Sequence, residues 1–448
     1  MMRVVWLSAA MLLCVAVGNA GESVPGNEEQ RRDFQAIAAQ LDPGGELFLV
    51  LRAGRWMDRI LKSLAEGQGG LPATVPGEQE VRDAIERIRR FMNQQGISAF
   101  RGIGTSSVDR GDGRHTFKLF LLRDAVDSNL PFWRGIFGWQ PRRLSSLDFV
   151  PTGFSMVLAG TLQPSSLWRV LTDGMQEVAD PPVVARFEAI RAALAERLGI
   201  PVEDLLGSLR DEFLVAVRFG TKPETDASEG EGGGSAIPVP SFVIIVGTGE
   251  DVLRGVVEAQ LARRQITLAE SVVAGERMRH AQDPLVGGPC ALQPAFASPP
   301  GFFVIGSSPA VVEEALLAYR HRNGLVTRPA FKDAFQGVAM VNNGIVYVDD
   351  EAARVLQRWI GRRLESASTT GAESLPATMR IRAVLNPLGA DLPACALVVQ
   401  NWRHGVMLMG SAGIGGETLI KQAGSVAWVL WQRLWDGAAV LLPEQEGL

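Results

Sequence analysis

Apolar positions follow two spacings in the stretch 46–124. The run ELFLVL at residues 46–51 is short and continuous, as in a buried strand. Two sets of apolar residues at helical spacing follow, and the second set ends before Gly96. The first set is Trp56, Ile60, Leu61 and Leu64, and the second is Val81, Ile85, Ile88 and Met92. Two more apolar runs, 98–108 and 115–122, flank the polar turn 109–114. The pattern predicts a strand, two helices and a hairpin.

The same order recurs over residues 149–249. A strand is expected at 154–160, and the helix after it has Ser165 or Ser166 available as its N-cap. A second helical pattern ends at Gly199, which suits the left-handed conformation that terminates helices. Runs at 211–219 and 241–247 then predict two strands.

A reduced third copy covers residues 344–413. It starts with the strand 344–349, after which Asp349 or Asp350 can cap a helix. That helix is carried by Ala352, Leu356, Trp359 and Arg363. The runs 379–385, 396–402 and 405–413 predict strands, and a second helix of comparable strength is missing from the pattern.

These units predict an α+β fold, in which strand–helix–(helix)–strand–strand units form antiparallel sheets with helices packed on one face. Strands joined by short turns pair antiparallel. The units span 27–148, 149–342 and 343–448, as separate domains or with shared sheets. Residues 220–241 interrupt the second unit and are rich in Gly, Ser, Pro and acidic residues, which predicts a flexible insertion.

The first residues have the layout of an export signal. Arg3 is the only charged residue before Glu22, and an apolar run occupies 4–17. Small residues follow at Gly18 and Ala20, which predicts a signal peptide over 1–20 and a linker over 21–26. We therefore expect a periplasmic or extracellular protein. An uncleaved N-terminal membrane anchor is the alternative, although the run is short for a membrane span.

Composition restricts the class of protein further. The chain has 448 residues, of which 46% are hydrophobic and 21% charged, so a sizeable core is expected. The net charge of −5 argues against a dedicated nucleic-acid binder, which needs a basic surface.

Cysteine and histidine are too sparse for a metal centre. After loss of the leader, Cys290 and Cys395 remain. Export allows them to form a disulfide, and the alternative is that both are small buried side chains. The four histidines have no metal-ligand spacing, so neither a metal nor a cofactor is expected.

Standard catalytic motifs are absent from the sequence. It has no GxSxG and no HExxH. The acidic pairs at 203–204 and 211–212 and the acidic run 349–351 are best explained as helix caps and helix-dipole partners. Ser308 followed by Pro309 is ordinary helix-start chemistry rather than a phosphate site. An enzyme is therefore the less favoured class.

Three tryptophans lie on one helical side near the C-terminus: Trp428, Trp431 and Trp435. Core packing or docking to a partner is the favoured explanation. Contact with a membrane surface is the alternative, but interfacial helices favour a polar face rich in Lys and Arg, and only Lys421 and Arg433 are nearby.

The tract 301–309 continues with Val312, Ala315 and Leu316, and then with Phe331 and 347–349. It resembles a family of bacterial envelope proteins known as a domain of unknown function, over roughly the second half of the chain. The resemblance implies an exported bacterial protein with repeated α+β units, and it gives no catalytic residues.

Together these observations favour a non-enzymatic exported protein of the bacterial envelope with a binding or structural role. Its partner is then an unknown envelope component. A carrier for a lipid or another apolar ligand is the alternative, and an enzyme with an unrecognised site is the second alternative.

Overall fold

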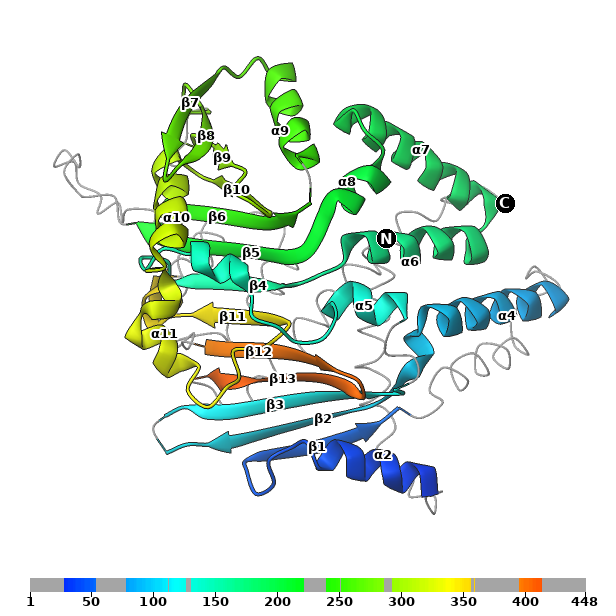
Figure 1. Cartoon of the computed structure of the whole chain (residues 1–448). Coiled ribbons are helices and arrows are strands. Elements are labelled where there is room, and N and C mark those ends of the chain that lie inside the picture. The colour runs from blue at the N-terminus through cyan, green and yellow to red at the C-terminus, as the bar shows by residue number, and fades with distance from the viewer. Residues whose placement is uncertain are drawn as a thin grey trace, which may run out of the picture.

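A computed structural model describes residues 28–53, 78–111, 113–125, 130–220, 239–249, 251–285, 292–355, 358 and 395–412. Its described strands form one sheet of 13 strands, in the order β1-β2-β3-β13-β12-β11-β4-β5-β6-β10-β9-β8-β7 (Figure 1). Every neighbouring pair is antiparallel. The prediction of an α+β chain with antiparallel strands is confirmed at this level.

The strands include the hairpin and strand runs predicted from the sequence within the described residues. They are β1 Leu47–Arg52, β2 Phe100–Asp109, β3 His115–Arg123, β4 Met156–Thr161, β5 Leu209–Gly220, β6 Val239–Thr248, β7 Leu268–Val273, β8 Glu276–Ala281, β9 Ala295–Ala297, β10 Phe302–Gly306, β11 Gly344–Val348, β12 Cys395–Trp402 and β13 Gly405–Ala412. Strands β7, β8 and β9 had not been predicted, because β7 and β8 mix apolar and charged residues and β9 has only three residues.

One helix precedes the first strand, and the others lie between strands in the chain. They are α2 Glu28–Ala38, α4 Glu78–Gln95, α5 Pro131–Phe137, α6 Pro164–Val178, α7 Pro181–Leu198, α8 Val202–Ser208, α9 Val252–Arg263, α10 Pro309–His321 and α11 Pro329–Ala334. Residues 350–355 are also helical.

The three predicted units share this one sheet. Strands β1–β2–β3, β4–β5–β6 and β11–β12–β13 are each neighbours in order. The third set lies between the other two, because β13 pairs with β3 and β11 pairs with β4. Residues far apart in the sequence therefore become partners, such as Val346 of β11 and Leu158 of β4, which are 188 positions apart.

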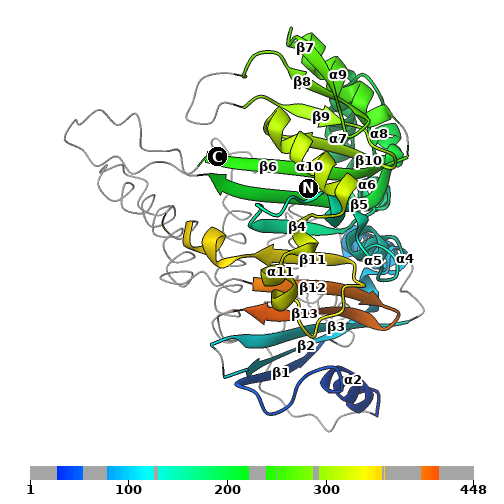
Figure 2. The same cartoon turned by 60° about the vertical axis from the view of Figure 1, so that its left-hand side comes forward.

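One face of the sheet, called here the first face, is covered by α2, α10 and α11 (Figure 2). Ile37 of α2 approaches β2 where a Cβ on Gly102 or Gly104 would come within 2.8 or 2.2 Å of its side chain, so the two glycines make room for the helix. At the other end, Val311 and Val312 of α10 belong to the main buried core. That core also includes Phe149, Phe154, Phe331, Ile345 and Tyr347.

Helices α4, α5, α6, α7 and α8 pack against one another beside one end of the strands (Figure 1).

The prediction that Gly199 ends a helix is confirmed, since this residue ends α7 with φ of 82° and its N–H donates to Ala195 O. The predicted start of α6 at Ser165 or Ser166 is wrong. The helix starts at Pro164, whose fixed φ suits the first helical position, and Gln163 precedes it.

Two other cap predictions are confirmed, and one burial prediction is wrong. Ser308 Oγ accepts a hydrogen bond from Val311 N, and Asp349 Oδ1 accepts one from Ala352 N at 2.9 Å.

The run 46–51 was expected to be a buried strand, but β1 is the edge strand and leaves Phe48 and Leu49 exposed. An apolar run does not reveal whether its strand lies at the edge or in the middle of a sheet.

Several predictions fall outside the described residues. These are the leader 1–20, the linker 21–26, the helix pattern at 56–64, most of the insertion 220–241, the strand 379–385 and the C-terminal tryptophans. They stay predictions.

Candidate functional site

The second face of the sheet, opposite α2 and α10, is also apolar. In the central strands, burial alternates with side-chain direction: residues 157 and 159 of β4 are buried, whereas 156 and 158 are not. The same alternation appears in β5, β6, β11 and β12. When both faces of a sheet are covered, the sequences of its strands are continuously apolar, and these strands have such sequences.

We call the partly exposed side chains of this face the apolar patch. It comprises Met156, Leu158, Phe213, Val215, Val217, Phe242, Ile244, Val246, Ile305, Val346, Val348, Cys395 and Leu397. None of these side chains carries a charge. Leu158, on a central strand of the sheet, is 48% exposed.

Strand register aligns the patch into rows across the sheet. One row runs through Ile305, Ile244, Val215, Leu158, Val346 and Leu397, each the Cα partner of the next. Such partners place their side chains on the same face, about 5 Å apart. The row is therefore a continuous strip of branched aliphatic side chains across six strands.

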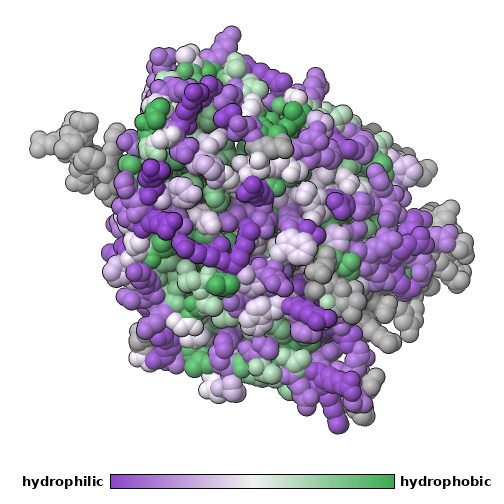
Figure 3. Space-filling view, in the orientation of Figure 1, coloured by the Kyte–Doolittle hydropathy of each residue, from purple (hydrophilic) through white to green (hydrophobic). Residues whose placement is uncertain are grey.

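The patch has defined borders. At one end of the strands, Val399 and Val406 of the same face are packed in a cluster with Trp133 of α5 and Ile85 of α4. Beyond β10, the row continues through buried Phe296 to the charged Arg279. The side of the molecule that carries α10 is, by contrast, mostly hydrophilic with scattered apolar spots (Figure 3).

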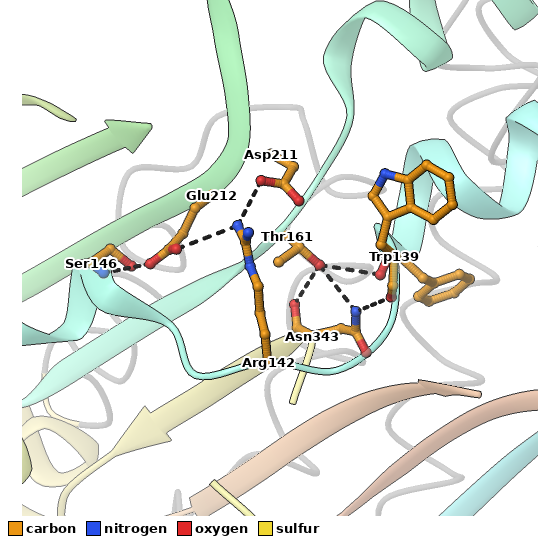
Figure 4. Close-up of polar contacts among 8 residues, drawn as sticks. Trp139, Arg142, Ser146, Thr161, Asp211, Glu212 and Asn343 are labelled. Atoms are coloured by element: carbon orange, nitrogen blue, oxygen red, sulfur yellow. Dashed lines mark hydrogen bonds and ion pairs between the residues drawn. The ribbon is translucent and has the colours of Figure 1, made fainter. Parts of the chain in front are cut away.

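A polar cluster lies at the strand ends beside α5 (Figure 4). Asn343, just before β11, donates from Nδ2 to Trp139 O at 2.6 Å, and its Oδ1 accepts from Asn401 N at 2.6 Å. Thr161 N donates to Asn343 O at 2.7 Å. Asn401 Nδ2 donates to Gly138 O at 2.8 Å. These buried amides fasten the loop after α5 to three strands, which is a structural role.

An ion-pair cluster continues from it along the same loop (Figure 4). Arg142 lies 2.6 Å from Asp211 and 3.5 Å from Glu212. Glu212 is buried and accepts a hydrogen bond from Ser146 N. The helix-cap explanation of 211–212 is therefore wrong, because both residues lie in β5 and hold the loop. Neighbouring carboxylates that share an arginine do not form the opposed pair that glycoside hydrolysis requires.

Arg123 is the most unusual charged group of the described chain. It is 3% exposed, and its Nη2 donates to Asn401 Oδ1 at 2.6 Å and to Trp402 O at 2.8 Å. Its guanidinium lies 5.1 Å from the centre of the Trp133 ring. Burial lowers the pKa of Arg123 to about 10, so the group stays charged at neutral pH. Within the described residues, its Nε and Nη1 have no hydrogen-bond partner.

The predicted site residues are only partly placed. Cys395, at the start of β12 on the second face, has no disulfide partner among the described residues, and burial raises the pKa of its thiol to about 11, so it is not a reactive thiolate at neutral pH. Cys290 lies outside the described residues, so the disulfide stays a prediction. Trp428, Trp431 and Trp435 lie outside them as well.

Metal-ligand clusters and membrane-spanning helices are both absent from the described residues. Across the described ranges, no group of three or more His, Cys, Asp or Glu side chains could hold a metal ion. None of the helices described is long and apolar enough to cross a bilayer.

The apolar patch was missed from the sequence, although a signal for it exists. Runs such as FVIIVG and GIVYV lack the alternation of a strand with one wet face. Comparison with known proteins adds no assignment: no protein-family model, curated protein or solved structure matches the chain.

Proposed function

We propose that the chain is a non-enzymatic exported protein of the bacterial envelope that binds an apolar component of that envelope through the apolar patch. One observation carries the proposal: the strip from Ile305 to Leu397 crosses six strands without a polar side chain, and Leu158 at its centre is 48% exposed. Contiguous exposed apolar surface of this kind is typical of interaction sites.

The chemistry of the patch favours an aliphatic ligand. Its side chains are mainly Val, Ile and Leu, with Phe213 and Phe242 as the aromatic members. Protein interfaces are enriched in Tyr, Trp, Phe, Met and Arg, and of these the patch has only two Phe and one Met. The backbone of these central strands is paired on both sides, so it leaves no edge for an added peptide strand. A lipid acyl chain needs neither such interface side chains nor a free strand edge in order to bind.

Native mass spectrometry of the protein purified from its source tests the proposal. We expect a co-purified lipid or other apolar compound that is retained under gentle ionisation and lost after denaturation. A protein that carries no apolar compound, and takes up none from lipid vesicles, would contradict it.

Export is part of the same proposal and rests on the leader at 1–20. A fusion of residues 1–25 to a reporter that is active only in the periplasm should give activity, and the same fusion with Leu12→Arg and Leu13→Arg should abolish it, because charge interrupts the apolar run. A fusion that accumulates in the cytoplasm and gives no reporter activity would rule out an envelope role.

We also propose that the three strand sets derive from one repeated strand–helix–strand–strand unit with its helices on one face. Support comes from β1–β2–β3, β4–β5–β6 and β11–β12–β13, each of which forms an ordered antiparallel set. The helices α4 and α6 follow the first strand of the first and second sets.

A further inference from the structure

The apolar patch is an unusual surface to leave in water, and the chain itself has a segment suited to cover it. Residues 413–448 follow β13, which ends at Ala412 inside the sheet, between β3 and β12. We propose that this C-terminal segment docks on the apolar patch through the side of Trp428, Trp431 and Trp435. The inference rests on the proposed function, because it makes the segment an internal competitor for the ligand.

The point where the segment leaves the sheet supports this docking. Ala412 is the Cα partner of Cys395, and the row continues through Val348, Met156, Val217 and Phe242. All of these residues are on the second face. The opposite end of the strands on this face is covered by α4 and α5. The segment therefore starts at the border of the patch that no described helix covers.

The lengths are compatible. The distance from β13 to β5 is four strand spacings, about 19 Å. The about 13 residues between Ala412 and Val426 can span roughly 40 Å when extended. A helix over 426–435 would be about 15 Å long. Its tryptophan side could thus lie across β12, β11, β4 and β5.

The composition of the segment favours the sheet over a membrane surface. Between Gln422 and Gln432 it has no charged residue, and Arg433 is on the side of the helix opposite Trp431. A helix at a membrane interface usually has many basic residues on its polar face. Large aromatic side chains above a strip of Val, Ile and Leu would remove apolar area from water on both partners.

Thiol labelling of the full chain tests the docking. In a Cys14→Ser, Cys290→Ser, Cys395→Ser background, Leu158→Cys places a thiol in the patch and Ile190→Cys places one on α7. The two native side chains are 48% and 53% exposed, so the structure alone predicts similar reaction rates with an uncharged maleimide. Docking predicts that the Leu158→Cys thiol reacts about tenfold more slowly, because it must wait for the segment to open.

A matched pair of variants shows whether the C-terminal segment is what protects the thiol at position 158. Adding Trp431→Asp should raise the rate at Leu158→Cys to that at Ile190→Cys, whereas Arg433→Asp should leave it low. In the chain with no change in the segment, a benzophenone attached at the Leu158→Cys thiol should crosslink to peptides from 413–448, so the test does not depend on folding of the tryptophan variant.

Several outcomes would overturn the proposal. Equal rates at the two thiols would show that the patch is open. Crosslinks to another segment would show that this other segment covers the patch. Protection that disappears on dilution would show that a second copy of the chain covers it. Protection that disappears on lipid extraction would show that a bound lipid covers it. Labelling and crosslinking need no added ligand, so docking can be established even if the lipid test of the proposed function fails.

Discussion

Glu203 shows how single residues connect the helices beside the sheet. Its Oε1 accepts from Trp168 Nε1 at 2.6 Å and lies 2.9 Å from Arg191 Nε, so α6, α7 and α8 meet at one carboxylate. Burial acts to raise the pKa of Glu203, but the hydrogen bond from Trp168 and the charge of Arg191 outweigh it, and the pKa is lowered from 4.5.

The lowered pKa makes this contact sensitive to acid. A carboxylate with a lower pKa in the folded state stabilises the fold fully above its unfolded value and loses that contribution as the pH falls through the folded value. We expect Glu203→Gln to lower the free energy of unfolding at pH 7, and the difference from the wild type to shrink below pH 4.5. Urea unfolding at pH 7, 5 and 3.5 measures it. A difference that does not change with pH would contradict the role of the charge.

Ala274 has a backbone conformation that suits glycine better. It is the first residue of the two-residue turn between β7 and β8, with φ of 54°, and Gly275 follows with φ of 88°. Turns of this kind favour Asn or Gly at both positions. Ala274→Gly should therefore raise the free energy of unfolding by about 1 kcal/mol.

The control for this turn is another alanine of the same hairpin. Ala269→Gly, within β7, should lower the free energy of unfolding by about 0.5–1 kcal/mol because glycine loses more freedom in a strand. If both glycine variants change stability in the same direction, the strain assigned to Ala274 is not there.

At the scale of elements, helix starts were only partly predictable. Ser308 could be identified from its place before Pro309, and its Oγ does accept from Val311 N. Ser165 and Ser166 looked equally suitable for α6, yet Pro164 starts that helix and Ser166 Oγ donates to Gln163 Oε1 at 3.2 Å. A capping side chain works only if the chain enters the helix at that residue.

This difference gives a paired test. Ser308→Ala should lower the free energy of unfolding by about 1 kcal/mol, because one N–H at the start of α10 loses its acceptor. Ser166→Ala should change it by less than about 0.5 kcal/mol. Thermal or urea unfolding of both variants is sufficient. Equal losses would mean that α6 uses Ser166 after all.

Strand positions were predictable from apolar runs, but their neighbours were not. The hairpin of β2 and β3 follows from the short turn between them, and so does that of β12 and β13. In contrast, the pairing of β13 with β3 joins Leu408 to Leu119, almost 300 residues apart, and no local signal specifies it. The polar cluster of Asn343, Asn401 and Thr161 was unpredictable for the same reason.

On the scale of the whole molecule, one sheet crosses all three predicted units. Its first face is buried by α2, α10 and α11, and its second face has the apolar patch. Placement of the third set of strands between the first two is what makes the strip from Ile305 to Leu397 continuous. If the three units were separate domains, this strip would end at β4.

The central claim is that this patch is where an apolar ligand binds, and a charge at its centre tests it most directly. The measurement is the dissociation constant for a fluorescent long-chain fatty acid. Leu158→Lys should weaken binding at least about tenfold, because the ammonium must be desolvated beneath the ligand. Ile190→Lys on α7, where the native side chain is similarly exposed, should bind as the wild type does. Equal affinities for the two variants, with both proteins folded, would contradict the account.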